Sequence, residues 1–258
     1  MGSALIKGWI AAKTFSAIHV IEPAPSTALK SLARKGAITL QAVLPAALPS
    51  VAAIVLAIKP QVLKGDDKLL RALGDTGALV LSIAAGIGTP LLRQKLGRAG
   101  PLVRAMPNTP GAIGRGITVL CAGSKLAAPS RALAEDLMAA LGETLWLNDE
   151  SLMDAVTAVS GSGPAYVFLT VEALAAAGRA QGLDAPTAER LARATVSGAG
   201  ALLGADSRPA SNLRKEVTSP GGTTEAALRV LMASDGLESL MQRAVDAATR
   251  RSRDLGKA

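Results

Sequence analysis

The sequence predicts an α/β fold in which a mostly parallel sheet domain is followed by an all-α domain. Short apolar runs alternate with helical segments in the first part of the chain, as is typical of parallel strands joined by right-handed crossovers. After Leu147 the strand signals stop, and the chain is helical almost to its end. A chain of 258 residues is long enough for two domains, which we expect at residues 1–148 and 149–258.

Four runs in the first part are almost continuously apolar, as strands buried on both faces must be. They lie at residues 17–21, 53–58, 78–83 and 102–105, with helical segments between them at residues 27–34, 61–73 and 90–96. Edge strands are expected at residues 116–120 and 143–147, around a helix at residues 130–141. The uncharged stretch 36–58 is long enough to cross a membrane, but Pro45 and Pro49 interrupt it, which favours two buried strands and a connector.

The second part begins with an N-cap and acidic first turn at Asn148, Asp149 and Glu150. Four Ala-rich helical segments follow, at residues 165–181, 185–203, 223–232 and 237–255. Helices this rich in small side chains pack closely, and they expose long apolar faces when they stand alone. One interpretation is an ordinary helical domain. The interpretation we favour is a dimerisation domain, in which two chains of an obligate homodimer interleave these helices.

Composition excludes several classes of function. A single cysteine, Cys121, allows no intrachain disulfide and fits a reducing compartment. A single histidine, His19, rules out multi-Cys/His zinc sites, and we expect no metal. The net charge is +8, but an aromatic fraction of 2% leaves few side chains to stack on bases, so we expect no nucleic-acid partner. No basic-then-apolar leader opens the sequence, and we therefore expect a cytoplasmic protein without a membrane partner.

The first residues resemble the end of a dinucleotide-binding fingerprint, G-x-G-x-x-G followed by a helix. Gly2, Ser3 and Ala4 match its last glycine and the helix start, whereas the preceding strand and the two earlier glycines are not in the sequence. The run at residues 17–21 would be the second strand of a Rossmann-type sheet. Glu22 follows it, about 20 residues after Gly2, where an acid binds ribose hydroxyls and disfavours a 2′-phosphate. Glu22 thus favours NAD over NADP, with a plain surface carboxylate as an equal alternative, and His19 is interpreted as structural.

Two further strand ends suit a nicotinamide cofactor, because ligands of open parallel sheets bind at the carboxyl ends of the strands. One strand ends in Ala57, Lys59 and Pro60, which provide a cation and a rigid turn. The next ends in Ala84, Ala85 and Gly86, whose small side chains let a ring lie against the backbone. Taken singly, each stretch is more often only a strand end.

The segment from Val217 to Glu225, VTSPGGTTE, places a proline turn and two glycines just before a predicted helix. Unpaired N–H groups at the positive end of the helix dipole, with the hydroxyls of Ser219, Thr223 and Thr224, favour a carboxylate or phosphate. A helix cap without a ligand is an equal alternative. A second Gly/Ser turn opens a helix at residues 160–166, and it could face the first.

Four motifs together resemble the pyrroline-5-carboxylate reductase family in sequence, order and spacing. They are RAMPNTP at 104–110, GRGIT at 114–118, VSGSGPAY at 159–166 and VTSPGGTTE at 217–225, the last being the most specific. The resemblance extends from Met1 to about Leu255. It implies NAD(P)H-dependent reduction of 1-pyrroline-5-carboxylate to L-proline. It also implies a Rossmann-type domain, a helical dimerisation domain and a homodimer, with a larger ring of dimers as a further option.

The resemblance also implies roles for residues of this sequence. Those that would hold the substrate carboxylate are Ser219, Gly221, Gly222, Thr223 and Thr224, and Thr224, the candidate catalytic residue, would lie near the ring nitrogen. Ser162, Gly163 and Pro164 would border the pocket. Cofactor contacts would come from Lys59, Pro60, Ala84, Ala85 and Asn108, in addition to the residues already named.

Two rival interpretations remain. A β-hydroxyacid dehydrogenase shares the two-domain plan but uses a lysine on the interdomain helix as acid, and residues 163–180 contain no lysine. The other rival is a catalytically impaired or silent dimeric remnant, in which the absent first strand exposes a sheet edge or leaves a gap in the sheet. Titration with NADPH or NADH separates this remnant from an active enzyme.

Overall fold

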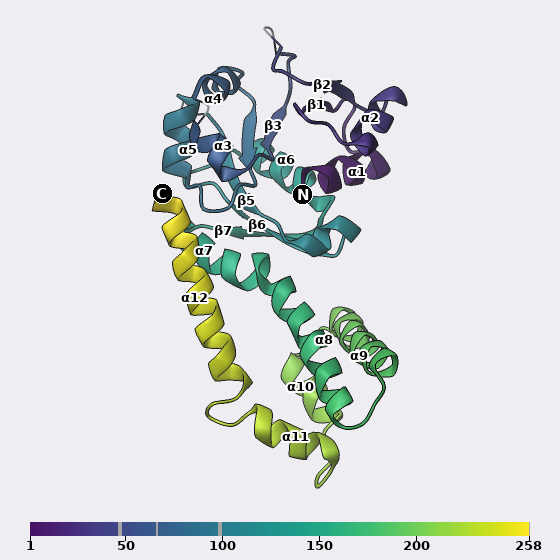
Figure 1. Ribbon diagram of the computed structural model, residues 1–258. Coiled ribbons are helices and arrows are strands. Elements are labelled where there is room, and N and C mark those ends of the chain that lie inside the picture. The colour runs from purple at the N-terminus through teal and green to yellow at the C-terminus, as the bar shows by residue number, and fades with distance from the viewer. Residues whose placement is uncertain (46–47, 66, 98–99, 258) are drawn as a thin grey trace. The chain divides into compact units, whose positions relative to one another are not determined.

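The computed structural model describes residues 1–45, 48–65, 67–97 and 100–257 (Figure 1). The chain divides into two compact units, which are described separately. Unit 1 consists of residues 1–161 together with 248–258, and unit 2 consists of residues 162–247. The predicted boundary at residue 148 coincides with the end of the last strand, whereas the division by packing falls at residue 161 and returns the C-terminal residues to unit 1.

The strands of unit 1 form two parallel-paired groups. In the smaller, β1 (His19–Ile21) pairs with β2 (Thr39–Gln41). In the larger, β3 (Ala53–Leu56), β4 (Leu79–Ser82) and β5 (Leu102–Met106) run parallel; β6 (Gly116–Cys121) is antiparallel to β5 and parallel to β7 (Gly142–Leu147). The predicted mostly parallel sheet is confirmed, and the uncharged stretch 36–58 does contain two strands, β2 and β3, although residues 46 and 47 lie outside the described ones.

Helices cover both faces of the larger sheet. They are α1 (Gly2–Ala12), α3 (Pro60–Gly65), α4 (Asp67–Gly74), α5 (Thr89–Leu96) and α6 (Ala128–Ala139), with a 3-10 turn η1 (Thr109–Ile113), whereas α2 (Thr27–Arg34) packs against β2 of the smaller group. Because strand side chains alternate, Leu79 and Leu81 of β4 pack into one core with α1 and α6, while Val80 packs into a second core with α3, α4 and α5. The predicted helix at residues 61–73 is found as α3 and α4, with residue 66 between them outside the description.

The two strand groups share one core but not one hydrogen-bonded sheet. The core that includes Leu79 and Leu81 also contains Leu29 and Ile38, which flank β1 and β2. Among the described residues, β1 pairs only with β2, and β3 pairs only with β4, so each has one free edge. All four residues of β4 are buried, whereas Ile21 of β1 is 39% exposed and β3 is mostly half-buried. The structure therefore agrees with an interrupted sheet.

Helix α1 is held firmly against α6 and the strands. The indole Nε1 of Trp9 donates to the carbonyl oxygen of Leu137 over 2.8 Å. At Gly8 an added Cβ would lie 2.7 Å from Cβ of Ala140, closer than side chains approach, so only glycine lets the two helices come together there. The start of the chain thus has a fixed place beside the sheet.

Beyond β7 come the short helices η2 (Glu150–Leu152) and α7 (Met153–Val156) and a π-helical turn η3 (Thr157–Gly161). Unit 2 then contains α8 (Gly163–Ala180), α9 (Ala185–Ala205), α10 (Ala210–Glu216), α11 (Thr223–Leu231) and the first half, residues 237–247, of α12 (Leu237–Lys257). The all-α second part is confirmed. Within the described residues no helix combines the length and apolar character needed to cross a membrane.

Unit 2 has almost no interior of its own. Its buried apolar residues are only Ala175, Ala188 and Ala192, at the contact of α8 with α9. By contrast, Phe168 and Leu169 of α8 are each 62% exposed, and further exposed apolar side chains lie on α9, α11 and α12, namely Leu191, Leu202, Leu203, Val230, Leu231, Leu237 and Leu240. An apolar surface this extensive is characteristic of an interface between chains.

Candidate active site

The candidate cofactor residues of unit 1 gather at one edge of the sheet. Ala57, Lys59 and Pro60 follow β3, and residues 84–86 follow β4; because these strands are parallel, their carboxyl ends share that edge. The start of α1 reaches the same place, since a Cβ added to Gly2 would lie 3.2 Å from Cβ of Ala57. The structure thus brings together the helix start and the strand ends that the sequence pointed to separately.

Close backbone approach at this edge depends on small residues. Ala84 is buried, and Gly86 adopts a φ of 72°, a left-handed conformation that favours glycine. Ser82, buried at the end of β4, accepts a 3.4 Å hydrogen bond from the N–H of Ala84 through its Oγ. The turn after β4 is therefore compact and rigid.

Glu22 and Asn108 follow β1 and β5, and one oxygen of each side chain already accepts a hydrogen bond. Glu22 follows β1, in the smaller strand group, and its Oε1 accepts from the N–H of Ala24 over 3.0 Å. Oδ1 of Asn108, just after β5, accepts from the N–H of Ile117 over 3.1 Å and so ties the end of β5 to the start of β6. Asn108 thus has a structural role in addition to any contact with a cofactor.

The residues at this edge fit a dinucleotide. The first N–H groups of α1, at Gly2 and Ser3, lie at the positive end of the helix dipole, where a pyrophosphate binds well. A side chain at Gly2 would crowd Ala57, so glycine keeps the helix start close to the strand end. Lys59 is exposed beside it and supplies a positive charge.

In unit 2, the turn before α11 has the geometry of an anion-binding site, except that one of its N–H groups already has a partner within the chain. The N–H of Gly222 donates to the carbonyl oxygen of Ser219 over 3.0 Å, closing a turn in which Gly221 has a φ of 72°. Gly222 is the N-cap of α11 and provides no side-chain cap, so the first N–H groups of the helix, at Thr223 and Thr224, have no partner among the described residues. The N–H of Gly221, however, donates to Oε2 of Glu225 over 2.7 Å.

The second Gly/Ser turn begins α8. Ser162 is its N-cap without a side-chain hydrogen bond, and Pro164 stands in its first turn. Figure 1 shows the start of α8 and the turn before α11 well apart within unit 2. Within one chain the start of α8 therefore does not meet the turn before α11, and the two turns do not face each other there.

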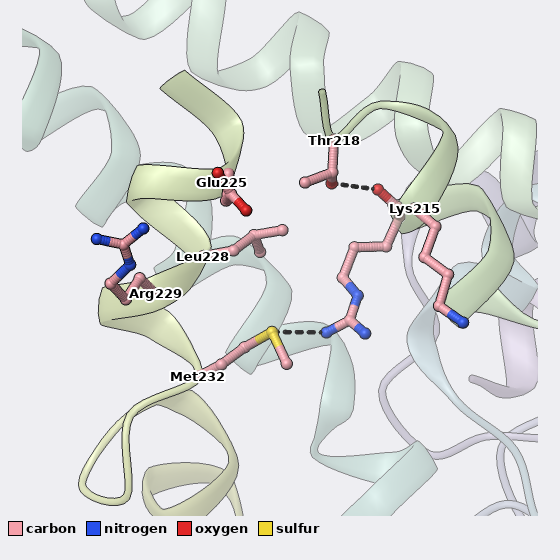
Figure 2. Close-up of a pocket in the computed structure, with 7 residues that line it drawn as sticks. Lys215, Thr218, Glu225, Leu228, Arg229 and Met232 are labelled. Atoms are coloured by element: carbon pink, nitrogen blue, oxygen red, sulfur yellow. Dashed lines mark hydrogen bonds between the residues drawn. The ribbon is translucent and has the colours of Figure 1, made fainter. Parts of the chain in front are cut away.

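A pocket of about 430 Å³ opens between α10 and α11, next to the 217–225 segment (Figure 2). Its lining residues are Arg214, Lys215, Thr218, Glu225, Leu228, Arg229 and Met232. Figure 2 shows Lys215 and Arg229 pointing to opposite sides, while Leu228 and Met232 line the space between the helices. Thr218 donates its hydroxyl to the carbonyl oxygen of Arg214 over 2.6 Å. Arg214 and Arg229 belong to no sequence motif, because lone cations on short helices form no recognisable pattern, and only the fold brings them to this pocket.

A partly buried ion pair supports the sheet edge in unit 1. Nη1 of Arg104, on β5, donates to Oε1 of Glu150 over 2.8 Å, and the N–H of Thr89, at the start of α5, donates to the same oxygen over 2.7 Å. Burial acts to raise the pKa of Glu150, but these hydrogen bonds outweigh it and lower the pKa below its usual value. The sequence interpretation had placed Glu150 in a helix cap, and only the fold reveals that it reaches two other elements.

Three further polar groups of unit 1 lie buried. Burial raises the pKa of the Cys121 thiol, which stays in the core beside Met153. The hydroxyls of Thr89 and Thr118 are buried and lack a hydrogen-bond partner within the structure. Among the described residues, no cluster of three or more His, Cys, Asp or Glu side chains is arranged to hold a metal ion.

Comparison with known proteins points to one family. A family model described as pyrroline-5-carboxylate reductase dimerisation matches residues 150–255. The pyrroline-5-carboxylate reductase of Pseudomonas aeruginosa is 44% identical over 205 residues, which are 79% of this chain and 74% of the relative. A solved structure of a pyrroline-5-carboxylate reductase from Coxiella burnetii matches 100% of this chain and 95% of its own, with 35% identity and a TM-score of 0.89. The structure of a Plasmodium falciparum pyrroline carboxylate reductase with NADP bound matches 99% of this chain and 94% of its own, with 26% identity and a TM-score of 0.76.

Proposed function

The chain belongs to the pyrroline-5-carboxylate reductase family, and we propose on that premise that it reduces 1-pyrroline-5-carboxylate to L-proline with NADPH or NADH. The observation that carries the proposal is the turn at residues 217–225. There the uncapped start of α11 offers the N–H groups of Thr223 and Thr224 beside two threonine hydroxyls. Such a site suits a small carboxylate.

The chemistry requires positioning more than acid or base catalysis. A cyclic imine protonated on nitrogen is already a good hydride acceptor, and the cofactor supplies the hydride when bound. Holding the carboxylate and the ring in one orientation can contribute about 7–11 kcal/mol to catalysis. The N–H groups of Thr223 and Thr224 would hold the carboxylate, the Thr224 hydroxyl would hydrogen-bond the ring nitrogen, and solvent would supply the proton.

The edge of the sheet in unit 1 is the proposed cofactor site. Gly2, Ser3 and Ala4 would face the pyrophosphate, Glu22 the ribose, and the residues after β3, β4 and β5 the nicotinamide half. These last are Ala57, Lys59, Pro60, Ala84, Ala85, Gly86 and Asn108. The Plasmodium falciparum relative has NADP bound, whereas the charge of Glu22 favours NAD, so an activity assay must rank the two.

We further propose that the active form is a homodimer in a reducing, cytoplasmic compartment. Phe168 and Leu169 leave unit 2 with an uncovered apolar surface, and the match to a dimerisation model covers this unit. The start of α8 and the turn before α11, the two proposed substrate turns, lie apart in one chain (Figure 1), and a second copy would complete the pocket.

The alternative is an impaired or silent member of the family. The free edges of β1 and β3 favour it, because an interrupted sheet weakens the support of a cofactor at the strand ends. Such a protein would dimerise but would bind neither NADPH nor NADH at useful concentrations.

The test is oxidation of NADPH and of NADH by the purified chain with 1-pyrroline-5-carboxylate, followed by the loss of nicotinamide absorbance. Turnover supports the proposal and ranks the cofactors. Lack of turnover, together with lack of binding in a cofactor titration, supports the silent alternative. The same assay on a chain extended before Gly2 by a parallel strand and a G-x-G turn would then show whether that element restores activity.

A further inference from the structure

The C-terminal end of α12 returns to unit 1 and lies against α7. Ser252 is 5% exposed, although its neighbours Arg251 and Arg253 are exposed to solvent. Its Oγ donates a hydrogen bond of 2.6 Å to Oδ1 of Asp154, a residue 98 positions earlier in the chain. A buried hydroxyl bonded to a carboxylate so distant in sequence fixes the helix end in one place.

One turn further on, the same helix touches the turn after β4. A Cβ added to Gly86 would lie 3.4 Å from Cβ of Leu255 and 3.5 Å from the backbone nitrogen of Gly256. In the other direction, a Cβ added to Gly256 would lie 3.0 Å from the carbonyl oxygen of Gly86. Backbone thus meets backbone at this contact, and two glycines permit the approach.

The other end of this turn is held from η2. Oε1 of Glu150 accepts the N–H of Thr89, and a Cβ added to Gly88 would lie 3.7 Å from that oxygen. The segment from Gly86 to Thr89 is therefore fixed at both ends, by α12 at Gly86 and by Glu150 at Thr89. The neighbouring residues Ala84 and Ala85 belong to the proposed cofactor site.

We propose that Ser252 is a positioning residue for the cofactor, acting through the last turn of α12 on the turn at residues 84–89. This rests on the proposed function, in that the turn is taken to contact the nicotinamide half of the cofactor. Ser252 anchors the helix to Asp154, the anchored helix covers Gly86, and the covered turn keeps the shape that receives the cofactor. Loss of the anchor loosens the turn without removing any residue that would contact substrate.

The experiment compares four variants with the wild-type chain. Ser252→Ala and Asp154→Ala each remove the hydrogen bond, whereas Asp154→Asn keeps an oxygen acceptor in the same position. Ser239→Ala is the matched control, since Ser239 lies on the same helix and its Oγ accepts a local hydrogen bond from Arg243, four residues away. Two quantities are measured: amide hydrogen exchange of residues 84–89 in the ligand-free protein, and the Kd for NADPH from nicotinamide fluorescence.

We expect Ser252→Ala and Asp154→Ala to speed exchange in this turn by about tenfold, the effect of losing one hydrogen bond to a charged group. The Kd and KM for NADPH should rise by about three- to tenfold, because some binding energy must reorder the turn. The kcat at saturating NADPH and the KM for 1-pyrroline-5-carboxylate should stay within about twofold. Asp154→Asn and Ser239→Ala should behave as wild type.

Unchanged exchange, or faster exchange with an unchanged Kd for NADPH, overturns the proposal and leaves Ser252 a purely structural residue. A variant that does not fold is replaced by Leu255→Ala, which removes side-chain contact near Gly86 and keeps the hydrogen bond. A wild-type chain that binds neither cofactor contradicts the proposed function instead, and hydrogen exchange then still decides whether α12 holds the turn.

Discussion

The N–H of Gly221 donates to the carboxylate of Glu225 over 2.7 Å, so a side chain of α11 occupies one of the amides in its own leading turn. This contact stabilises the turn, in which Gly221 has a left-handed φ of 72°. It also places a negative charge beside the N–H groups proposed to receive the substrate carboxylate. Glu225 therefore orders the turn and would oppose a carboxylate bound there.

The two effects of Glu225 can be separated by substitution. Glu225→Ala removes the acceptor and frees the turn, and we expect the KM for 1-pyrroline-5-carboxylate to rise by about tenfold, the worth of one charge-assisted hydrogen bond. Glu225→Gln keeps an oxygen acceptor but removes the charge, so its KM should equal or fall below that of wild type. Steady-state kinetics at saturating NADPH provide the measurement, with Glu238→Ala in the first turn of α12 as control. Equal KM values for both variants would contradict the dual role.

Thr224 is the proposed partner of the ring nitrogen. Thr224→Ala should lower kcat by at least about tenfold, because one hydrogen bond made in the transition state is lost, whereas Thr224→Ser keeps the hydroxyl and most of the activity. Thr187→Ala is a matched control, since Thr187 occupies the first turn of α9 on an exposed surface. An unchanged kcat in a normally folded Thr224→Ala variant removes Thr224 from the mechanism.

The pair of Arg104 and Glu150 predicts a specific dependence of stability on pH. The pKa of Glu150 is lowered in the folded state relative to an unfolded value near 4.3, so the folded protein binds fewer protons there. Its stabilising contribution is complete above that unfolded value and is lost as the pH falls through the lowered pKa. Glu150→Gln should cost about 2–3 kcal/mol in unfolding free energy at pH 7, the worth of a hydrogen bond to a charged group. The difference in unfolding free energy between Glu150→Gln and wild type should become smaller at acid pH.

Urea unfolding of both proteins between pH 7 and pH 2–3 measures this difference. If the difference in unfolding free energy between wild type and Glu150→Gln stays constant across that range, the Glu150 carboxylate is not the group whose protonation changes the stability. Glu143→Gln, at an exposed position of β7, is the control, and its unfolding free energy should follow that of wild type.

The apolar surface of unit 2 predicts how the chain assembles. Phe168→Arg should weaken dimerisation by at least about tenfold, because a side chain that would be buried on association becomes a charge without a partner. Sedimentation equilibrium over a range of concentrations measures this. Val43→Arg makes the same kind of change at a 74% exposed apolar residue of unit 1 and should leave the dimer intact. If Phe168→Arg and Val43→Arg dimerise with equal affinity, the interface does not include Phe168.

Local patterns in the sequence were enough to predict most secondary structure. Continuous apolar runs at residues 78–83 and 102–105 correspond to β4 and β5, and the glycines and proline at 217–225 correspond to the turn before α11. Element limits were less accurate: the strand expected at residues 17–21 is only His19–Ile21, and one expected helix is found as α3 and α4. Strand ends depend on pairing partners, which a local pattern does not contain.

The sequence by itself determined the family, the order of the domains and the residue types at each strand end, because these are properties of segments a few residues long. Only the tertiary structure decided that the sheet is interrupted between β1 and β3, and that Glu150 joins Arg104 to Thr89. It likewise decided that the end of α12 contacts Gly86, and that the start of α8 and the turn before α11 lie apart in one chain (Figure 1). Each of these relations joins segments distant in sequence, and their geometry follows from how whole elements pack.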